Sequence, residues 1–534
     1  MSRPLHLADV LEVLADAVPE RTAVFTTARR YSFAELDERA TRLANHLIDL
    51  GLPVGAHVAI HASNRIEWVD ALYGCLKARL VPINVNYKYL ADELAYLYAN
   101  ADCVATLIAP EHVDTVAGLD LSLLRTTVVF GPEYDAALAA SSTDRSLGGR
   151  TEQRSGDDRY VLYTGGTTGR PKGVVWRIED LIRAALNESR FRAPIASVEQ
   201  LGEEAAANPT PMTLLACGPM MHGGSQWILG NAHVGGHTVA LYTERSFDAA
   251  QILDLVEAAG VASLTFLGDA MGRPVAEAIL AEPDRWDLSS LVAVSNGAAP
   301  LSAGVREQIR EALPGRFILD SMGASESGAT GSRIDDGTTP ATEAPTFTAG
   351  DEVTVLRADH TPAEVGEEGL LARSGPIPLG YYGDPAKTAA TFVEVGGVRW
   401  AIPGDAARRE ADGTITLLGR GSVSINTGGE KVHPEEVEST LLRHPDVFDA
   451  VVIGVAHERW GQQVVALVQL RDGASTTPAD LQAHCRSLIA NYKVPKEVIA
   501  VPHVPRTAVS KVDYAASAAL ARALLSDPTL TAQS

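Results

Sequence analysis

The sequence has 534 residues, of which 46% are hydrophobic and 21% charged, which is enough for roughly three or four domain-sized units with sizeable cores. Its formal net charge of -22 argues against nonspecific binding to nucleic acids or membrane surfaces, because both are polyanionic. We expect neither a membrane span nor a secretory signal, because no apolar run has the length of a span and the first residues lack an apolar segment. The four scattered cysteines lack metal-binding spacing and indicate reduced thiols in a cytoplasmic protein.

The first part of the chain is predicted to alternate helices with strands. Apolar residues recur at helical spacing over residues 7–18, and Ser32 and Glu35 form a capping box ahead of a second helix. Short apolar segments at 58–60 and 80–83 then alternate with helical stretches. This alternation predicts an α/β fold in which helices cover both faces of parallel sheets.

A glycine- and threonine-rich loop lies between two apolar runs at residues 160–175. Glycines let backbone N–H groups approach an anion, while threonine hydroxyls and a lysine add donors and charge. The loop is not a Walker loop, because Lys172 follows Pro171 and no Gly-Lys-Ser/Thr ending is present. A glycine-rich hairpin without a ligand would need neither the threonines nor the lysine. The predicted phosphate-binding residues are therefore Thr164, Gly165, Gly166, Thr167, Thr168, Gly169 and Lys172.

Residues 190–213 are polar and poorly periodic, and we expect a surface excursion there. Residues 214–217 then form an apolar strand that ends near His222 and Gly223. Such a strand tip is where ligands of α/β sheets usually bind, although a histidine bonded to backbone in the core is an alternative. A later strand at 291–295 ends in glycine and small residues, so a flat ring could lie against its backbone.

Glu326 follows another strand tip, three residues beyond a glycine, where a carboxylate could reach Mg²⁺ held on phosphate oxygens. A helix cap formed by Ser325 and Glu326 is the alternative. Beyond about residue 345 the pattern changes to short strands and turns, with a two-residue turn predicted at Asp412 and Gly413. The C-terminal strands and helices indicate a small α+β domain.

Residues 163–173 resemble the signature loop of the adenylate-forming superfamily, which includes acyl-CoA synthetases, peptide-synthetase adenylation domains and luciferases. The best match is to bacterial fatty-acyl and aromatic-acid CoA ligases, and it covers nearly the whole chain. The resemblance implies a large N-terminal domain over residues 1–419, including a β-rich subdomain at about 345–419. It also implies a small mobile lid domain over 420–534 that turns near Ser422, where the family commonly has Asp or Lys.

The resemblance implies a role for each matching residue. Lys511 would be the adenylation lysine, although Ser510 stands where glycine is usual, and Glu326 would bind the metal. With Glu326 and Lys511, Thr164 and Lys172 complete the expected catalytic set. Met322 replaces an aromatic residue that stacks on adenine. The other expected nucleotide contacts are Gly297, Ala298, Ala299, Asp320, Ser321, Gly323, Ser325, Asp405 and Arg420, the last two at the ribose. The expected acid-binding residues are His222, Gly223, Trp227, Gly268 and Gly297.

The implied reaction activates a carboxylic acid with ATP and Mg²⁺ through an acyl-adenylate, and then forms a thioester with CoA. The expected CoA contacts are Gly428, Gly429, Lys431 and Trp460. One alternative keeps adenylation but changes the partners, as in a diazotase that activates nitrite for an aryl amine or in an amide-forming ligase. A regulator with a dead site is disfavoured, because Lys172, Glu326, Asp405 and Lys511 are all present. The acid remains open, and a homodimer is expected only from oligomer statistics.

Overall fold

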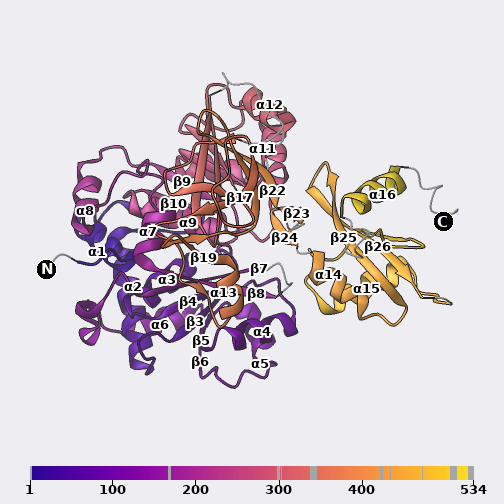
Figure 1. Cartoon of the computed structure of the whole chain (residues 1–534). Coiled ribbons are helices and arrows are strands. Elements are labelled where there is room, and N and C mark those ends of the chain that lie inside the picture. Colours follow the sequence, from indigo (N-terminus) through magenta and orange to yellow (C-terminus); the bar gives the residue numbers. More distant parts are fainter. Residues whose placement is uncertain are drawn as a thin grey trace.

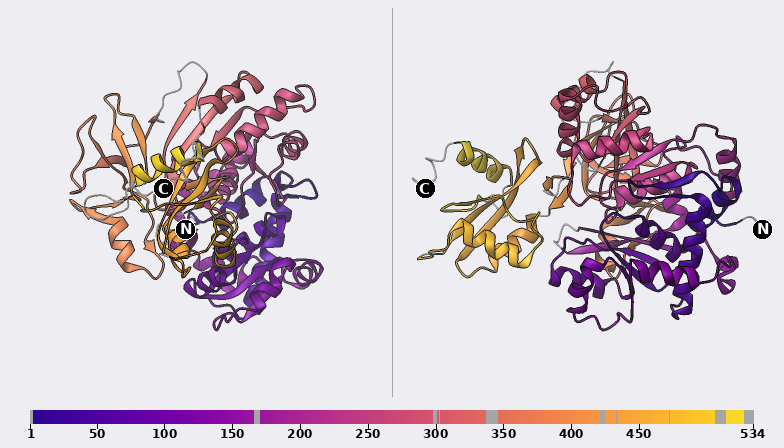
Figure 2. Two further views of the ribbon diagram at one scale, coloured as in Figure 1. Left: turned by 90° about the vertical axis from the view of Figure 1, so that its right-hand side faces the viewer. Right: turned by 180° about the vertical axis from the view of Figure 1, so that it is seen from behind.

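The computed structural model describes residues 3–165, 170–297, 301, 303–336, 346–420, 425–432, 434–471, 473–505 and 514–526. Within these ranges, the side chains at 165, 269, 270, 303, 418–420, 435, 439 and 515 are not described. Figure 1 shows a large part, residues 3–420, with the C-terminal part, residues 425–526, at one side of it. The right view in Figure 2 again separates the two parts, whereas in the left view the C-terminal part lies in front of the large part.

The first two helices form where the apolar spacing predicts them. They are α1 (Leu7–Ala17) and α2 (Phe33–Asp49). Ser32 Oγ accepts a hydrogen bond from the Glu35 amide at 3.2 Å, and Glu35 Oε2 accepts one from the Ser32 amide at 2.7 Å. The capping box is therefore confirmed, and it satisfies two amides that the helix itself leaves without partners.

Two sheets with parallel central strands confirm the α/β prediction, and helices lie against them (Figure 1). One sheet runs in the order β18 (Gly380–Tyr381), β8 (Pro171–Arg177), β7 (Arg159–Gly165), β4 (Val81–Asn84), β3 (His57–His61), β5 (Cys103–Ile108), β6 (Thr126–Val129). Its helices are α3 (Ile66–Lys77), α4 (Ala91–Asn100), α5 (Val113–Ala117) and α6 (Pro132–Ala140). Only the pairs β7·β8 and β8·β18 within its described strands are antiparallel.

The second sheet runs in the order β14 (Gly328–Asp335), β13 (Phe317–Ala324), β12 (Ala293–Asn296), β11 (Ser263–Phe266), β9 (Thr213–Ala216), β10 (Thr238–Leu241), β1 (Thr22–Phe25), β2 (Arg30–Ser32). The helices along this stretch of the chain are α7 (Ile178–Ala185), α8 (Val198–Ala207), α9 (Gly223–Val234), α10 (Ala249–Ala259), α11 (Asp269–Ala281) and α12 (Ala303–Ala312). The strands β9 to β13 are parallel to one another, so their carboxyl ends share one edge.

The prediction of a surface excursion at 190–213 is wrong in part. Helix α8 lies within it, and its Val198, Leu201 and Ala205 side chains are buried. A Cβ added at Gly202 would lie 3.3 Å from the backbone oxygen of Val13, so α8 packs closely on α1. Short polar stretches flank this helix on both sides, so the hydrophobic periodicity of residues 190–213 as a whole did not predict it.

The β-rich segment predicted beyond residue 345 is present as a third sheet. Its order is β15 (Thr346–Phe347), β22 (Ile415–Arg420), β21 (Asp405–Arg409), β17 (Glu368–Arg373), β20 (Val398–Ala401), β19 (Phe392–Val395), with β16 (Val353–Leu356) beside β17 and α13 (Pro385–Thr391) before β19. The turn between β21 and β22 is one residue longer than predicted, because the Gly413 amide donates to the Glu410 oxygen at 3.0 Å and the loop includes Ala411.

The C-terminal part has its own sheet, in the order β24 (Glu430–Val432), β23 (Ile425–Thr427), β26 (Gly461–Leu470), β25 (Val447–His457), with β27 (Glu497–Ala500) beside β26. Its helices are α14 (Pro434–Leu442), α15 (Pro478–Leu488) and α16 (Tyr514–Ser526). Its buried apolar residues pack in clusters drawn only from this part. The described residues contain no helix long and apolar enough to cross a membrane.

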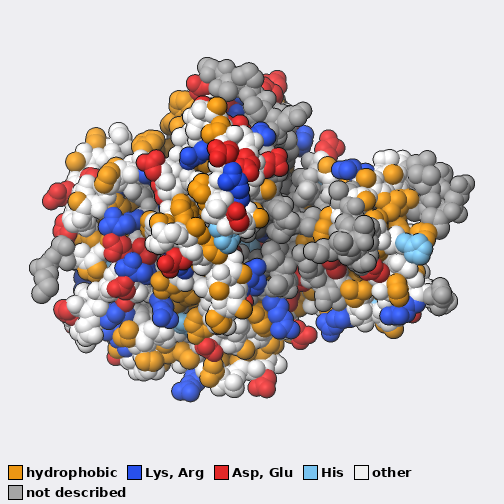
Figure 3. All heavy atoms as spheres, in the orientation of Figure 1, with side chains coloured by type: hydrophobic (Ala, Val, Ile, Leu, Met, Phe, Trp, Pro, Cys, Tyr) orange, Lys and Arg blue, Asp and Glu red, His pale blue; other side chains and the backbone are white. Residues whose placement is uncertain are grey.

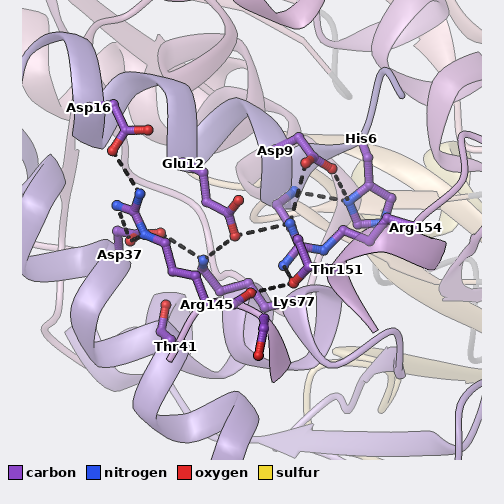
Figure 4. Close-up of polar contacts among 12 residues, drawn as sticks. His6, Asp9, Glu12, Asp16, Asp37, Thr41, Lys77, Arg145, Thr151 and Arg154 are labelled. Carbon is purple, nitrogen blue, oxygen red and sulfur yellow. Dashed lines mark hydrogen bonds and ion pairs between the residues drawn. The ribbon is translucent and has the colours of Figure 1, made fainter. Parts of the chain in front are cut away.

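A buried charge network joins α1, α2 and α3 in the large part (Figure 4). The Nζ atom of Lys77 lies 2.6 Å from Glu12 Oε1 and 2.7 Å from Asp37 Oδ1. Arg154 pairs with Glu12 at 2.9 Å, and its side chain is also buried. Buried charges are tolerated only when they are paired, so this network constrains how the helices pack.

On the outer surface, by contrast, acidic and basic side chains are interspersed over one face of the large part (Figure 3).

Candidate active site

The strand pair β7·β8 carries the described ends of the glycine- and threonine-rich loop. Thr164 lies opposite Lys172, and Gly165 lies opposite Pro171. Burial lowers the pKa of Lys172, and Lys387 acts in the same direction, whereas nearby carboxylates oppose the shift. The predicted phosphate-binding residues between these ends, Gly166, Thr167, Thr168 and Gly169, lie outside the described residues.

Tyr381 links the two sides of the site and was not predicted as a site residue. Its hydroxyl donates a hydrogen bond to Glu326 Oε1 at 2.9 Å. The Nζ atom of Lys172 lies 5.8 Å from the centroid of the Tyr381 ring, on the neighbouring strand of the same sheet. The sequence around Tyr381 indicated only a strand and a turn, so its proximity to Glu326 is a tertiary feature.

Glu326 stands half-buried on the loop between β13 and β14. Its carboxylate has the oxygen ligands that Mg²⁺ prefers, so it suits a cation shared with phosphate oxygens. No cluster of three or more His, Cys, Asp or Glu side chains that could hold a metal occurs within the described ranges. A metal at this position would therefore need ligands from a bound nucleotide as well as from Glu326.

The backbone of the loop that carries Glu326 accepts hydrogen bonds from Arg373 and Trp176. The Arg373 guanidinium is buried and donates to the backbone oxygens of Ser327 at 2.6 Å and Ala329 at 3.0 Å. The Trp176 indole donates to the Ser325 oxygen at 3.0 Å. Burial lowers the pKa of Arg373 to about 10, against an opposing effect of Glu352. These bonds fix the backbone on both sides of the carboxylate.

Two of the predicted nucleotide contacts on β13, Asp320 and Met322, have buried side chains. The Asp320 carboxylate is buried, accepting from Arg306 at 2.9 Å and from Asn296 at 3.2 Å. Met322 is 6% exposed and packs in the core of the β-rich sheet with Phe347. Alternation along the strand places Asp320 and Met322 on its buried face. The structure thus holds Met322 in a core rather than on an open platform for adenine, while Ser321 and Gly323 are exposed.

The tips of β11 and β12 meet at the predicted acid and adenine site. The Gly268 amide donates to Asn296 Oδ1 at 2.9 Å, and Gly268 has a φ of +70°, which favours glycine. Gly297 has open space where a side chain would stand, its nearest neighbour being the Ser321 oxygen at 3.8 Å. Ala298 and Ala299 lie outside the described residues. The backbone near Gly297 is therefore accessible to a flat group.

Asp405 and Arg420, the residues predicted at the ribose, lie opposite each other at one end of a hairpin. They are direct partners across the antiparallel pair of β21 and β22. Asp405 is half-buried, and only the backbone of Arg420 is described. The hairpin therefore holds both residues at its end nearest the C-terminal part.

A buried carboxylate of the C-terminal part reaches the predicted acid-binding residue His222. Glu430 Oε2 lies 2.9 Å from His222 Nε2, and Glu430 Oε1 forms an ion pair with Lys88. Burial alone would raise the pKa of Glu430, but His222 and Lys88 outweigh it and lower the pKa to about 2. Glu430 and Lys88 were not predicted as site residues, although Glu430 follows the predicted Gly428 and Gly429.

His222 is the N-cap residue of α9, which also carries Gly223 and Trp227. A Cβ added at Gly223 would lie 2.5 Å from Leu162, so glycine lets α9 approach β7. Within the described part of the chain, the buried Nε1 atom of Trp227 has no hydrogen-bond partner. Helix α9 therefore connects β7, the strand before the glycine- and threonine-rich loop, to the His222 contact.

Two of the predicted CoA-binding residues, Gly428 and Gly429, border a cavity between the two parts. Gly428 (φ +58°) packs under the Trp460 ring and donates to the Trp460 oxygen at 3.0 Å. Gly428, Gly429 and Glu430 line a cavity of about 100 Å³ together with Cys217, Leu267 and other residues of the large part. Lys431 is half-buried on β24, next to this loop. The predicted Ser422, Ser510 and Lys511 lie outside the described residues.

The architecture matches known structures over the whole chain. The amide bond synthetase McbA from Marinactinospora thermotolerans superposes with a TM-score of 0.76, covering 96% of this chain and 99% of that one. At 24% identity, this likeness establishes the fold alone. The chain therefore shares its fold with this amide bond synthetase.

Sequence comparisons then give the family. Residues 11–382 match the AMP-binding enzyme family, and residues 436–511 match the AMP-binding enzyme C-terminal domain. The 3-oxocholest-4-en-26-oate–CoA ligase of Rhodococcus rhodochrous is 43% identical over 96% of this chain and 95% of that protein. The medium/long-chain-fatty-acid–CoA/3-oxocholest-4-en-26-oate–CoA ligase of Mycobacterium marinum is 42% identical over 96% of each chain. This chain belongs to the AMP-binding enzyme family, and the resemblance to the adenylate-forming superfamily is confirmed.

Proposed function

We propose that this enzyme is an ATP-dependent acid–CoA ligase: it forms an acyl-adenylate with release of pyrophosphate, and then transfers the acyl group to the thiol of CoA with release of AMP. The relatives that share more than 40% identity over nearly the whole chain are CoA ligases, which supports this order of steps. The single observation that carries the proposal in this chain is the contact of Glu430 with His222, which sets the glycine loop of the C-terminal part beside the acid-binding residue.

For adenylation, the proposed division of the chain is a large domain over residues 1–419 and a lid over residues 420–534 that turns near Ser422. In the large domain, Thr164 and Lys172 bind the phosphates, with the loop residues Gly165 to Gly169. Lys172 is the cation on this side, and Glu326 would hold Mg²⁺. When bound, Mg²⁺ would neutralise negative charge on the phosphates. Tyr381, which donates to Glu326, keeps one carboxylate oxygen oriented.

The lid supplies Lys511 to the attacking oxygen and the α-phosphate. The remaining proposed nucleotide contacts are Asp405 and Arg420 at the ribose, Gly297, Ala298 and Ala299 at the adenine, and Ser321, Gly323 and Ser325 near the α-phosphate. The burial of Asp320 and Met322 supports a role for their backbone, or a role in supporting the strand, rather than a direct side-chain contact.

For the thioester step, the pantetheine arm of CoA passes along the cavity bordered by Gly428, Gly429 and Glu430. Two glycines with positive φ allow the loop to lie close to Leu267 and Trp460, which a side chain at either position would prevent. Trp460 and Lys431 contact CoA from the lid side. In this orientation Glu430 draws the His222 imidazole toward the lid loop.

The acid is a bulky apolar carboxylic acid, either a medium- or long-chain fatty acid or the side-chain acid of a steroid. This choice follows the two acid types in the names of the curated relatives. His222, Gly223, Trp227, Gly268 and Gly297 border its site. The four cysteines, which are free and buried, suit the reducing cytoplasm.

The proposal is tested by AMP release from ATP and Mg²⁺ with a panel of acids, each with and without CoA. Fatty and steroid acids should release AMP, and CoA should accelerate turnover and yield the thioester. AMP release that ignored both CoA and every carboxylate would contradict it. Parallel assays with amines, and with nitrite plus an aryl amine, test the amide-forming and diazotase alternatives.

The role of Lys511 has its own test. A Lys511→Ala variant should lose on the order of 10²-fold in adenylation, as fixed transition-state donors do. Lys496, an exposed lysine of the same part, gives the matched control Lys496→Ala for the same half-reaction. A Lys511→Ala enzyme that formed acyl-adenylate at the full rate would overturn the assignment.

A further inference from the structure

A second contact joins the C-terminal part to the large part, and it is built around Lys493. The Nζ atom of Lys493 lies 2.6 Å from Glu93 Oε1 on α4 and 2.7 Å from Glu436 Oε1 on α14. The Lys493 side chain is 4% exposed, and both carboxylates are largely buried. Its ammonium also lies 4.6 Å from the centroid of the Tyr89 ring. One buried cation thus bridges a carboxylate from each part.

In the large part, a local hydrogen bond orients the Glu93 carboxylate toward Lys493. Glu93 Oε2 accepts a hydrogen bond from the Leu90 amide at 3.0 Å, within the cap of α4, which leaves Oε1 directed at Lys493. Asn86, seven residues earlier, donates to the Tyr492 hydroxyl at 3.3 Å. The segment 86–93 therefore receives two neighbouring residues of the C-terminal part.

The two contacts together determine how the C-terminal part is oriented. A body attached through one ion pair can still turn about it, whereas a second attachment removes that freedom. Glu430 provides one attachment, to His222 and Lys88, and Lys493 provides the other, to Glu93. Both are present in the orientation that sets the glycine loop beside the cavity.

A rotation of the lid would affect the two ion pairs of Lys493, with Glu93 and with Glu436, differently. Lys493 and Glu436 belong to the same part, so their ion pair can move as a unit. Glu93 belongs to the large part, so its pair with Lys493 must break. The contact with Glu93 is consequently specific to the orientation seen here.

We propose that Lys493 is a positioning residue for the thioester-forming half of the reaction: by bridging Glu93 and Glu436 it holds the lid with the glycine loop at the cavity. This inference rests on the proposed ligase function and adds to it a residue that touches neither ATP nor the acid. Removing the bridge should slow acyl transfer to CoA and leave acyl-adenylate formation unchanged.

The test measures the two half-reactions separately in Glu93→Gln and Lys493→Met. Acid-dependent exchange of pyrophosphate into ATP reports adenylation, and single-turnover transfer from preformed acyl-adenylate to CoA reports the second half. Each variant should slow transfer about tenfold, as for truncated interfacial charge pairs, and change the exchange rate less than about twofold. The double variant should cost no more than either single one, because both remove the same bridge.

Glu179→Gln is the matched control. Glu179 is also an ion-paired glutamate, bound to Arg183 within the large part, and its loss should change neither half-reaction. Equal losses in both half-reactions would show a general structural role and overturn the proposal, as would full transfer rates in both variants.

Amide hydrogen exchange tests the Lys493 bridge independently of the proposed ligase function. Residues 86–93 and 490–496 should exchange faster in Glu93→Gln than in the parent protein, and the Glu179→Gln control should not change them. This readout needs no substrate. A parent enzyme inactive with every acid would defeat the ligase function, whereas unchanged exchange in both variants would defeat the bridge.

Discussion

His222 Nε2 and Glu430 Oε2 lie 2.9 Å apart, although 208 residues separate them in the chain. His222 caps a helix of the large part, and Glu430 begins a strand of the C-terminal part. Their contact joins the predicted acid site to the predicted CoA site. It also attaches the C-terminal part to the large part through a carboxylate, and the effect of removing that charge can be measured.

Replacing Glu430 by glutamine should slow thioester formation while adenylation persists. Glutamine keeps the shape but removes the charge that holds both His222 and Lys88, so we expect about a tenfold slower acyl transfer. Single-turnover transfer from preformed acyl-adenylate measures it. Glu497→Gln, at an exposed carboxylate of the same part, should leave transfer unchanged. Unaltered transfer in Glu430→Gln would separate this contact from catalysis.

Replacing Tyr381 by phenylalanine should weaken adenylation at limiting Mg²⁺. The variant loses the hydrogen bond to the Glu326 carboxylate, and bonds to charged groups support an effect of about tenfold. The dependence of pyrophosphate exchange on Mg²⁺ concentration reports the change. Tyr382→Phe is the control, because the Tyr382 hydroxyl donates to Asp102 instead. Identical Mg²⁺ dependence in Tyr381→Phe and the parent would argue against an orienting role.

Replacing Lys77 by methionine should destabilise the large part. The change removes the buried cation that Glu12 and Asp37 share and leaves each of them with one arginine, Arg154 and Arg145; breaking a buried pair costs on the order of 3–5 kcal/mol. Denaturant unfolding gives the free energy. Arg285→Met removes an exposed pair with Glu282 and should cost about 1 kcal/mol or less. Comparable losses in the two variants would contradict the network's importance.

Stability should depend on pH through Glu436. Burial raises the pKa of Glu436 to about 7 and Glu93 adds to the rise, whereas Lys493 opposes it; Tyr89 and Tyr492 also face this group. The folded state therefore binds the proton more tightly than the unfolded state, whose pKa is near 4.5. The resulting stabilisation is complete below about pH 4.5 and is lost as pH rises through about 7.

The Glu436→Gln variant isolates this effect, since glutamine resembles the protonated acid. Its stability relative to the parent should rise by about 3 kcal/mol between pH 4.5 and pH 8. Unfolding free energies of both proteins across that range provide the measurement. A difference between them that stayed constant with pH would exclude a raised pKa at this position.

Several features of the fold follow from short stretches of sequence. The capping box at Ser32 and Glu35 formed as predicted, because its hydrogen bonds join residues only three apart. The pairing of Asp405 with Arg420 follows from a local hairpin, although its turn is one residue longer than predicted. Helix α8 escaped prediction because its buried face depends on packing against α1.

The candidate site divides in the same way. Lys172 and Glu326 could be proposed as site residues from the motifs that surround them in the chain. The family match covers both parts of the chain. The bond from Tyr381 to Glu326 spans 55 residues, and Lys493 and Glu93 are 400 residues apart. No periodicity or spacing predicts such pairs. The burial of Met322 likewise depends on the core formed with the β-rich sheet.

By itself, the sequence determined the family and most of the order of helices and strands, because these depend on residues close together in the chain. Only the tertiary structure decided which carboxylates face which cations across the two parts. The physical reason is that those pairs exist only where separately folded elements dock, and docking is set by packing and burial over the whole surface.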